Sequence, residues 1–412
     1  MTQEIKQRIE QLRLNKTPDG YKKTAVGVIP QDWEVINLSD ISEYKTKKNV
    51  ENIKYPTFTN SATEGIIKQT DYFDKEISND ENISGYYLVN ENDFVYNPRI
   101  SVSAPCGPIN CSHIPETGIM SPLYTVFKLL KEKEFYEFFF HSSIWYKYMC
   151  SVANYGARSD RMNITNNDFF KMPLCQPPLA EQQKIAEILS TQDKVIELQQ
   201  KRIDELKKLK KAYLSKMFPQ KGSNVPELRF KGFTGNWEQH KCCELCSIST
   251  GKSNTQDNVP DGEYPFYVRS PIIERSNKYL YDEEAVLTVG DGVGTGKVYH
   301  YVNGKYDLHQ RVYRMFNFDK SISAKYFYYY FSNHFYERVM MMTAKTSVDS
   351  VRLDMIADMN IHFPKIAEQQ KIGSFFRTLD NIITLQSRKL DAEKLKKKSL
   401  MQLLLTGIVR VK

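Results

Sequence analysis

The chain lacks the long apolar segments that would place it in a membrane. None of its hydrophobic runs approaches the roughly 18 to 20 residues needed to cross a bilayer. Its first sixteen residues, MTQEIKQRIEQLRLNK, form a charged amphipathic stretch and not a signal peptide. We therefore expect a cytoplasmic protein.

Cysteine is also scarce, at seven residues of 412. An odd number without a secretory signal predicts reduced thiols and not a disulfide framework. Two clusters combine cysteine with histidine: Cys106, Cys111 and His113, and then His240, Cys242, Cys243 and Cys246. Neither has two well-spaced ligand pairs of the kind that a structural zinc site shows, although the second cluster holds four donors. We expect ordinary, partly buried cysteines and no metal site.

Motifs for catalysis are missing as well. The stretch GDGVGTGK looks like a phosphate-binding loop, but Asp291 and Val298 stand where that motif requires Gly and Ser or Thr. We predict instead a glycine-rich hairpin whose backbone approaches a ligand, such as a DNA backbone. Asn97-Pro98 begins like the amine-holding motif of amino-methyltransferases but lacks the second proline and the aromatic residue. With no nucleophile elbow and no HExxH either, we expect no catalytic residues.

The bulk composition describes a folded, mildly basic protein. Hydrophobic residues make up 41% of the chain, which is enough for real cores, and the length predicts two to four domains. Lys and Arg number 57 against 49 Asp and Glu, a formal charge of +8. That excess permits a polyanionic partner without requiring one.

A hexapeptide, AEQQKI, occurs twice, at 180–185 and at 367–372, which is an offset of 187 residues. Such an identity indicates an internal duplication. The same offset relates Thr191 to Thr378, Asp193 to Asp380, Ile196 to Ile383, Gln199 to Gln386 and Lys210 to Lys397. Upstream, the aromatic-rich segments 134–149 and 325–340 align at an offset of 191, and Trp33 aligns with Trp237 at 204. The repeat therefore covers nearly the whole chain.

Each hexapeptide opens a long amphipathic helix. Apolar residues recur at spacings of three and four after Pro178 and again after Pro364. About 38 residues without an internal proline would make each helix about 57 Å long. Because the chain must leave and return, we expect the two helices to bury their stripes against each other as an antiparallel coiled coil. Two unrelated surface helices are the alternative.

The rest of each repeat predicts a globular domain of roughly 140 residues. Alternating apolar residues and turn signals indicate strands, and the aromatic block indicates a helix packed on that sheet. Aromatic residues on all sides of a helix favour a core position over base stacking. We predict an α+β fold with a pseudo-two-fold repeat, divided as follows: a first globular domain with an N-terminal segment (1–177), long helix 1 (178–218), a second globular domain (219–363) and long helix 2 (364–412).

Two similar readers joined by a spacer of fixed length would read two short DNA segments separated by a gap, and half-sites about 34 Å apart lie within reach of such helices. The segments YKKTAVGVIPQDWE and PELRFKGFTGNWE, with the twice-used P…AEQQKI, closely resemble the specificity subunit of type I restriction-modification enzymes. The resemblance covers nearly all of the chain in the right order of domains and helices.

That resemblance implies a non-catalytic DNA-reading subunit with a bipartite target. It implies double-stranded DNA, two methyltransferase subunits and restriction subunits as partners. S-adenosylmethionine, ATP and Mg²⁺ would enter only through those subunits. A self-sufficient enzyme and a scaffold whose globular ends bind proteins are the other functions considered. The missing motifs count against the enzyme.

We predict DNA contacts in two loops of each repeat. The loop between the aromatic helix and the long helix supplies Tyr155, Arg158, Ser159, Arg161 and Asn163 in copy one, and Lys345, Thr346, Ser347 and Arg352 in copy two. The loop after the paired strands supplies Asn97, Arg99 and Ser101, and Asp291, Thr295 and Lys297. Lys and Arg would serve phosphates or guanine edges, and Asn or Ser adenine edges or backbone. A solvated loop is the alternative for each residue.

The long helices would form the spacer and hold the methyltransferase subunits. The candidate residues are Glu181, Gln182, Gln183, Ile185, Leu189, Ile196, Glu368, Gln369, Gln370, Ile372, Phe376 and Ile383. Lysines near the helix ends, such as Lys207, Lys208, Lys394 and Lys396, are expected to be solvated and not to contact bases.

Overall fold

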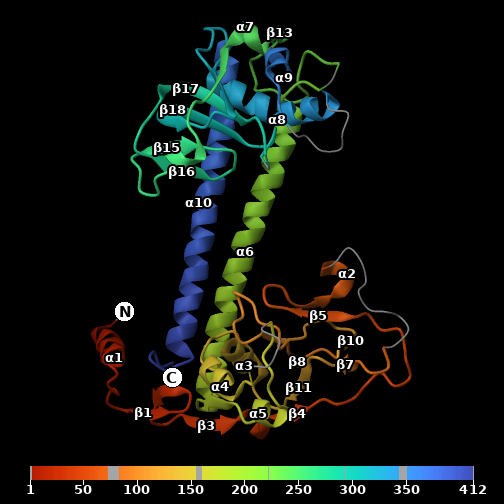
Figure 1. Ribbon diagram of the computed structural model, residues 1–412, viewed down its shortest axis with the longest axis vertical. Coiled ribbons are helices and arrows are strands. Elements are labelled where there is room, and N and C mark those ends of the chain that lie inside the picture. Colours follow the sequence, from red (N-terminus) through yellow and green to blue (C-terminus); the bar gives the residue numbers. More distant parts are fainter. Residues whose placement is uncertain are drawn as a thin grey trace. The chain divides into compact units, whose positions relative to one another are not determined.

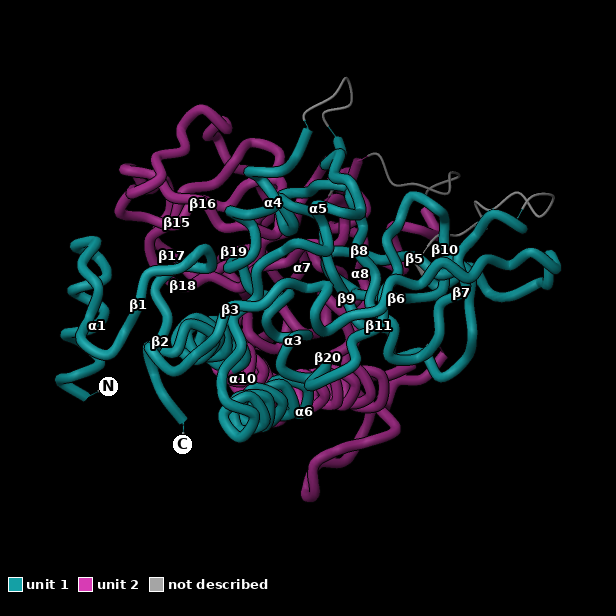
Figure 2. The backbone as a smooth tube through the Cα atoms, turned by 90° about the horizontal axis from the view of Figure 1, so that it is seen from below, with its two compact units in different colours: residues 1–198, 390–412 teal, residues 199–389 magenta. Residues whose placement is uncertain are grey.

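The computed structural model describes residues 2–72, 83–154, 160–220, 222–292, 294–342 and 350–411. The chain forms two compact units, coloured separately in Figure 2. Unit 1 comprises Met1–Leu198 and Leu390–Lys412, and unit 2 comprises Gln199–Lys389. Each unit mixes helices with largely antiparallel sheets, which confirms the predicted α+β class. Within the described ranges, no helix is long and apolar enough to cross a membrane.

Unit 1 is built on a four-stranded antiparallel sheet flanked by two-stranded sheets (Figure 1). The strand order in the larger sheet is β4(Ser42–Tyr44), β11(Thr125–Leu129), β8(Asp93–Tyr96) and β9(Ile109–Cys111). The smaller pairs are β1(Tyr21–Thr24) with β2(Gly27–Pro30), β3(Glu34–Asn37) with β12(Pro173–Gln176), β5(Phe58–Ser61) with β6(Gly65–Lys68), and β7(Tyr87–Val89) with β10(Gly118–Met120). All four residues of β8, DFVY, are buried, so this strand lies at the centre of the unit.

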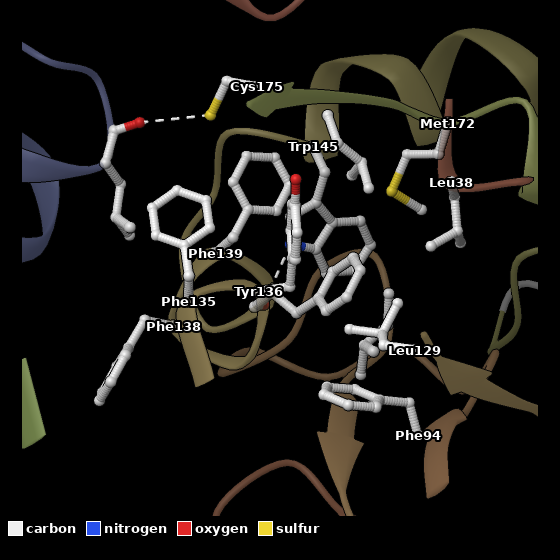
Figure 3. Close-up of a cluster of buried hydrophobic side chains, with 14 of the residues drawn as sticks. Leu38, Phe94, Leu129, Phe135, Tyr136, Phe138, Phe139, Trp145, Met172 and Cys175 are labelled. Carbon is white, nitrogen blue, oxygen red and sulfur yellow. Dashed lines mark hydrogen bonds between the residues drawn. The ribbon is translucent and has the colours of Figure 1, made fainter. Parts of the chain in front are cut away.

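The short helices of unit 1 are α1(Gln3–Arg13), α2(Gln69–Tyr72), α3(Lys133–Phe140), α4(Tyr146–Val152) and α5(Asn166–Phe170), with a 3-10 turn at Leu38–Asp40. Helices α3, α4 and α5 contribute aromatic side chains to the core of the unit. Figure 3 shows the rings of Phe135, Tyr136 and Phe139 of α3 gathered with Trp145. These side chains are buried, as the sequence predicts for the aromatic block.

The aromatic block of copy one is two helices, and the prediction of a single helix there is wrong. The chain breaks between α3 and α4 at His141–Trp145. There, Ser142 Oγ donates a hydrogen bond to the Phe139 carbonyl and Trp145 Nε1 donates one to the Phe140 carbonyl. These side-chain bonds satisfy carbonyls at the end of α3 and compete with helix continuation.

Unit 2 is built on one six-stranded sheet. The order is β14(Ser247–Thr250), β19(Val312–Phe316), β17(Tyr281–Val289), β18(Tyr299–Leu308), β15(Tyr264–Tyr267) and β16(Ile273–Ser276). Only β15 and β18 run parallel among these neighbours. A separate pair joins β13(Glu238–Lys241) to β20(Asn360–Phe363), and the short helices are α7(Cys242–Leu245), α9(Leu353–Ala357) and a 3-10 turn at Thr255–Asp257.

The aromatic block of copy two is a single helix, α8(Ala324–Met342), which packs on β17 and β18. Its buried side chains include Tyr326, Phe327 and Phe331, which join the core of unit 2. Here the predicted helix on a sheet is confirmed.

The two long helices also appear as predicted. They are α6(Leu179–Met217) and α10(Ile366–Leu404), each of 39 residues and each beginning shortly after a proline. Both helices contribute one part to each compact unit. In unit 1, Gln192 of α6 hydrogen-bonds Glu393 of α10 and Asp193 pairs with Lys397. The two segments run antiparallel, because Glu181 near the start of α6 meets Arg410 beyond the end of α10.

Unit 2 repeats these helix contacts at equivalent positions. Lys210 pairs with Asp380 at 2.5 Å, which is the counterpart of the pair between Lys397 and Asp193 in unit 1. Gln199 Nε2 donates to Gln386 Oε1, so two residues related by the offset of 187 bind each other. Residues that are repeated in the sequence therefore make equivalent contacts in the two parts of the helix pair.

Buried carboxylates of the hexapeptide secure the start of each long helix. Glu368, with 1% of its surface exposed, accepts two hydrogen bonds of 2.7 Å from the Arg229 guanidinium. Glu181, with 5% exposed, accepts bonds from Arg410 and from Trp33 Nε1. The next residue acts alike in both copies, since Gln182 and Gln369 donate to the carbonyls of Pro177 and Pro364.

Unit 1 is completed by segments from both ends of the chain. The Tyr21 hydroxyl donates to the Gly407 carbonyl, and Arg8 donates to the Ile408 carbonyl. Arg410 also binds both oxygens of Asp32. A side chain at Gly407 would collide with Pro30, because its Cβ would lie 2.4 Å from the Pro30 ring.

Candidate nucleic-acid interface

The two loops predicted to bind DNA in copy one form a single surface in unit 1, which we call site 1. It consists of residues 97–101, which follow β8, and residues 160–166, which lead into α5. The two segments pair through their backbones: Met162 N donates to the Pro98 carbonyl at 2.9 Å, and Ile100 N donates to the Asp160 carbonyl at 3.1 Å. An antiparallel bridge joins Arg99 to Arg161.

Site 1 carries cationic and amide side chains beside an open, tyrosine-lined hollow. Arg99 and Asn163 are exposed, while Arg161 is about one-fifth exposed and lies 3.5 Å from the Asp160 carboxylate. The hollow has a volume of about 430 Å³, and its lining includes Arg161, Asn163, Asn166, Tyr44, Tyr87, Tyr96 and Tyr124. Guanidinium and amide groups suit base edges and phosphates, and tyrosine rings suit bases or sugars.

Hydrogen bonds hold the polar side chains of this hollow in place. Asn166 Nδ2 donates to the Tyr44 hydroxyl at 3.0 Å, and the Tyr44 and Tyr87 hydroxyls lie 3.4 Å apart. Burial, followed by the bond with Tyr87, raises the pKa of Tyr44. The phenol therefore stays protonated at neutral pH and remains a hydrogen-bond donor.

The corresponding loops of copy two also meet, in what we call site 2. It consists of the described residues 290–292 and 294–297, which lie between β17 and β18, and residues 350–354 at the start of α9. Val351 N donates to the Gly290 carbonyl at 2.7 Å, and an antiparallel bridge joins Asp291 to Ser350. The predicted hairpin at 290–297 is confirmed, since β17 and β18 are antiparallel neighbours. Gly292 and Gly296 have φ of 87° and 63°, which the turn requires and which favour glycine.

Arginines dominate the charge of site 2. The Asp291 carboxylate lies 3.5 Å from Arg269 and 3.6 Å from Arg311, so one anion faces two cations. Arg352 is largely exposed and lies 3.3 Å from Asp354. An open hollow of about 560 Å³ is lined by residues that include Asp291, Gln310, Arg311, Tyr313, Ser350 and Arg352. The excess of guanidinium groups favours a polyanion here.

Some predicted contact residues have other roles in the structure. The Asn97 side chain is buried, donating to the Asn60 carbonyl and accepting from Arg99 N. Thr295 is also buried, with its hydroxyl donating to the Gly292 carbonyl. Both side chains support their loops and are not presented to solvent.

The remaining predicted residues of these loops are exposed or lie outside the described ranges. Ser101 is exposed and caps its own loop by accepting from Ala104 N. Lys297 extends over the Tyr336 ring, with Nζ 4.9 Å from the ring centroid. Tyr155, Arg158, Ser159, Lys345, Thr346 and Ser347 lie outside the described residues.

Several residues of the two sites were missed by the sequence reasoning. Tyr44, Tyr87 and Tyr124 reach site 1 from three different strands or loops, and Gln310 and Arg311 reach site 2 from the turn before β19. No local spacing links the tyrosines, so no signal could have found them. The sequence shows Arg311 only as one of many basic residues near a turn and does not distinguish it as a site residue.

The predicted docking residues on the long helices are mostly buried. Ile185, Leu189, Ile372 and Phe376 belong to the cores of their units. Glu181, Gln182, Glu368 and Gln369 make the internal bonds described above, and Ile196 and Ile383 are half-buried. Gln183 and Gln370 are exposed, at equivalent positions. One turn earlier on the same helix faces, Leu179 and Ile366 are 55% and 40% exposed.

Two equivalent surfaces of arginine, amide and tyrosine side chains, each on its own α+β domain, are features of a duplicated DNA-reading protein. Comparison with known families agrees. The family model for the type I restriction modification DNA specificity domain matches residues 30–208 and 234–394. The chain belongs to this family and carries its domain twice.

Known proteins of this family are similar along most of the chain. The MjaVIII type I restriction enzyme specificity subunit of Methanocaldococcus jannaschii is 26% identical, with 93% of this chain and 94% of the relative aligned. The EcoDI specificity subunit of Escherichia coli is 27% identical over 35% of this chain and 31% of its own length.

Solved structures share the fold. The crystal structure of a type I restriction-modification S subunit from M. genitalium aligns with a TM-score of 0.58 at 14% identity, covering 90% of this chain and 96% of that one. A chain from a study of complex assembly and conformational transition of the type I restriction-modification system aligns with a TM-score of 0.57 at 15% identity, covering 92% of this chain and 99% of that one.

Proposed function

We propose that this chain is the DNA-reading subunit of a type I restriction-modification complex. Site 1 reads one half of a bipartite target and site 2 the other, while the paired long helices set the unread gap. The observation that carries the proposal is the backbone pairing of two loops into one arginine-bearing surface, at corresponding places in both units.

In this proposal the chain itself performs no chemistry. Two methyltransferase subunits bring S-adenosylmethionine, and restriction subunits bring ATP and Mg²⁺. The purified chain should therefore neither methylate DNA from S-adenosylmethionine nor cleave it. Methyl transfer by the chain alone would support a self-sufficient enzyme instead. DNA binding without salt dependence or preference for a bipartite duplex would favour a scaffold that binds proteins.

The decisive experiment maps methylated adenines across a genome after co-expression of this chain with a methyltransferase subunit. Arg161→Ala should relax the recovered motif in one half and Arg352→Ala in the other, each with a loss of about 1–3 kcal/mol in discrimination at the affected position. Arg13→Ala is the matched control, because Arg13 is an exposed arginine on α1 outside both sites. If either variant changed both halves together, the assignment of one half to each unit would be wrong.

We further propose that the start of each long helix is a docking surface for a methyltransferase subunit. Leu179 and Gln183 on α6, and Ile366 and Gln370 on α10, present the same kind of exposed face in both copies. In unit 1 this face borders an open hollow of about 670 Å³ lined in part by Leu130, Pro178 and Leu179. Large exposed apolar residues beside a hollow are typical of interface anchors.

This docking surface is tested by pull-down of a methyltransferase subunit. Leu179→Arg and Ile366→Arg should each remove one docking site, so that each variant retains about half of the wild-type subunit. Val50→Arg and Ile272→Arg are matched controls, because these side chains are more exposed and lie away from the helices. Full retention by Leu179→Arg and Ile366→Arg together would disprove the surface.

A further inference from the structure

Four metal-binding side chains converge in unit 1, at the junction of β9 with α3. Cys111 is the last residue of β9, and His113 follows it two residues later. Glu137 and His141 are four residues apart at the end of α3, a spacing that places both on one face of that helix. The strand pair and the helix pair meet across one hollow.

The distances between donor atoms in this cluster are close to those in a tetrahedral zinc site. The donor atoms of Cys111, His113 and Glu137 all lie within 4.8 Å of one another, and His113 Nε2 is 2.7 Å from Glu137 Oε1. In a tetrahedral zinc site with bonds of 2.0–2.3 Å, donor atoms are roughly 3.5 Å apart. Each donor therefore needs to move by about 1 Å or less, which an exposed histidine and a helix-surface glutamate allow.

His141 is the candidate for the fourth position, although it lies outside the group of three residues whose donor atoms are within 4.8 Å of one another. Its side chain lines the same hollow of about 580 Å³ as the three other donors. Its Nε2 lies 3.0 Å from Asn110 Oδ1, on the residue just before Cys111. The set of one thiol, two imidazoles and one carboxylate matches the donor types that zinc prefers, and not those of magnesium or calcium.

The other cysteine clusters offer no comparable arrangement among the described residues. Cys106 faces Cys150, with the sulfur atoms 3.6 Å apart, and Cys242 faces Cys246 at 3.7 Å. His240 lies 3.3 Å from Glu244 but joins no group of three donors. Among the residues that the structure describes, the Cys111 cluster is the one group that unites sulfur, nitrogen and oxygen donors within 4.8 Å of one another.

We propose that Cys111, His113, Glu137 and His141 form a zinc site that fastens the end of β9 to the end of α3. Ser103 and Ala104 line the same hollow and follow site 1 directly in the chain. Metal binding would therefore stabilise the part of unit 1 that carries site 1. The proposal does not depend on DNA reading.

The test uses the full-length, reduced protein titrated with zinc against a chromophoric chelator. The wild-type chain should bind one zinc ion, and His113→Ala and Glu137→Gln should each weaken binding at least about tenfold. His240→Ala is the matched control, because it removes a histidine that also contacts a carboxylate, and its affinity should equal that of the wild type. Equal affinity in His113→Ala and the wild type would overturn the proposal.

Cobalt supplies an independent measurement. The cobalt complex of the wild-type chain should show the near-ultraviolet charge-transfer band of a thiolate ligand, and Cys111→Ser should abolish that band. Saturating zinc should raise the unfolding temperature of the wild type by about 5 °C and leave that of His113→Ala unchanged. A charge-transfer band that survives in Cys111→Ser and disappears in Cys246→Ser would place the metal at the other cluster and overturn the assignment.

Discussion

At the scale of single residues, the structural role of the hexapeptide rests on its glutamate, whose carboxylate is buried in both copies. The letters AEQQKI were predicted to mark helix starts where partners dock, and the helix starts are confirmed. The glutamates themselves point inward, Glu181 to Arg410 and Glu368 to Arg229. Sequence pattern could place them on a helix but could not reveal their partners, because each arginine belongs to a segment more than 130 residues away.

Replacing Arg229 should lower the free energy of unfolding, because the buried Glu368 carboxylate would lose its cationic partner. Arg229→Ala leaves the Glu368 carboxylate, 1% exposed, without its cation, and the pKa of Arg229, raised by its bonds to Glu368, reflects the same pairing. We expect the free energy of unfolding of unit 2 to fall by about 3–5 kcal/mol, measured by urea denaturation at pH 7.

A surface pair supplies the control for this prediction. Lys216 and Glu227 lie 2.7 Å apart, but both side chains are more than half exposed. Lys216→Ala should change the free energy of unfolding by less than about 1 kcal/mol. Similar losses in the two variants would contradict a special role for the buried pair.

The core of unit 2 should also respond to pH through His334. The imidazole stacks on Tyr330 at 4.4 Å, with Nδ1 2.8 Å from the Tyr330 carbonyl. Burial lowers the pKa of His334 below its usual value, and the fold therefore favours the neutral ring. The stabilisation is complete above the unfolded pKa of about 6.5 and is lost as the pH falls through the lower folded pKa.

Unfolding of unit 2 should therefore become easier between pH 7 and pH 5. His362 lies nearby and acts in the same direction, since burial lowers its pKa too. His334→Gln should reduce the slope of unfolding free energy against pH in this range without abolishing it. An unchanged slope in the variant would show that His334 does not contribute.

At the scale of elements, the long helices were predictable, and the loops that form the two candidate DNA-binding surfaces were only partly so. A shared hexapeptide, a preceding proline and apolar spacing of three and four are local signals, and they define α6 and α10. Arg161 and Arg352 were found because they follow the aromatic blocks at matching offsets. The backbone bridge between Arg99 and Arg161 joins residues that are 161 − 99 = 62 positions apart, and no local pattern encodes such a contact. The same holds for Tyr44, which reaches site 1 from the edge strand of its sheet.

If the helix pair sets the unread gap, lengthening both helices should lengthen the gap. Seven helix-favouring residues inserted after Gln199 in α6 and after Leu385 in α10, which keeps Gln199 opposite Gln386, add about 10 Å, or about three base pairs of DNA. Methylation mapping should recover the same two half-sites with the longer gap.

A single insertion is the control for this experiment. Insertion into α6 alone removes the match between Gln199 and Gln386 and shifts Lys210 away from Asp380. We expect such a variant to lose stability and not to read a lengthened target. An unchanged gap after the double insertion would show that the helices do not set the spacing.

At the scale of the whole molecule, the duplication was visible in the sequence, but the difference between its copies was not. Each aromatic block was predicted to form a single helix. Copy two does so in α8, whereas copy one breaks after Phe140, where side-chain bonds compete with the helix. Unit 1 divides its strands among small sheets, and unit 2 joins six strands in one sheet. Such differences arise from tertiary packing, which sequence similarity between the two copies does not determine.

The closure of unit 1 by both ends of the chain has a consequence for protein synthesis. Unit 2 is one continuous stretch, 199–389, so all of its residues have been translated before Leu390–Lys412 of unit 1 is added. Unit 1 cannot bury Trp33 and Glu181 fully until Arg410 and its neighbours have emerged. The unit whose translation begins first is therefore the last to have all of its residues, and a chain truncated before residue 405 holds every residue of unit 2 but lacks the segment that closes unit 1.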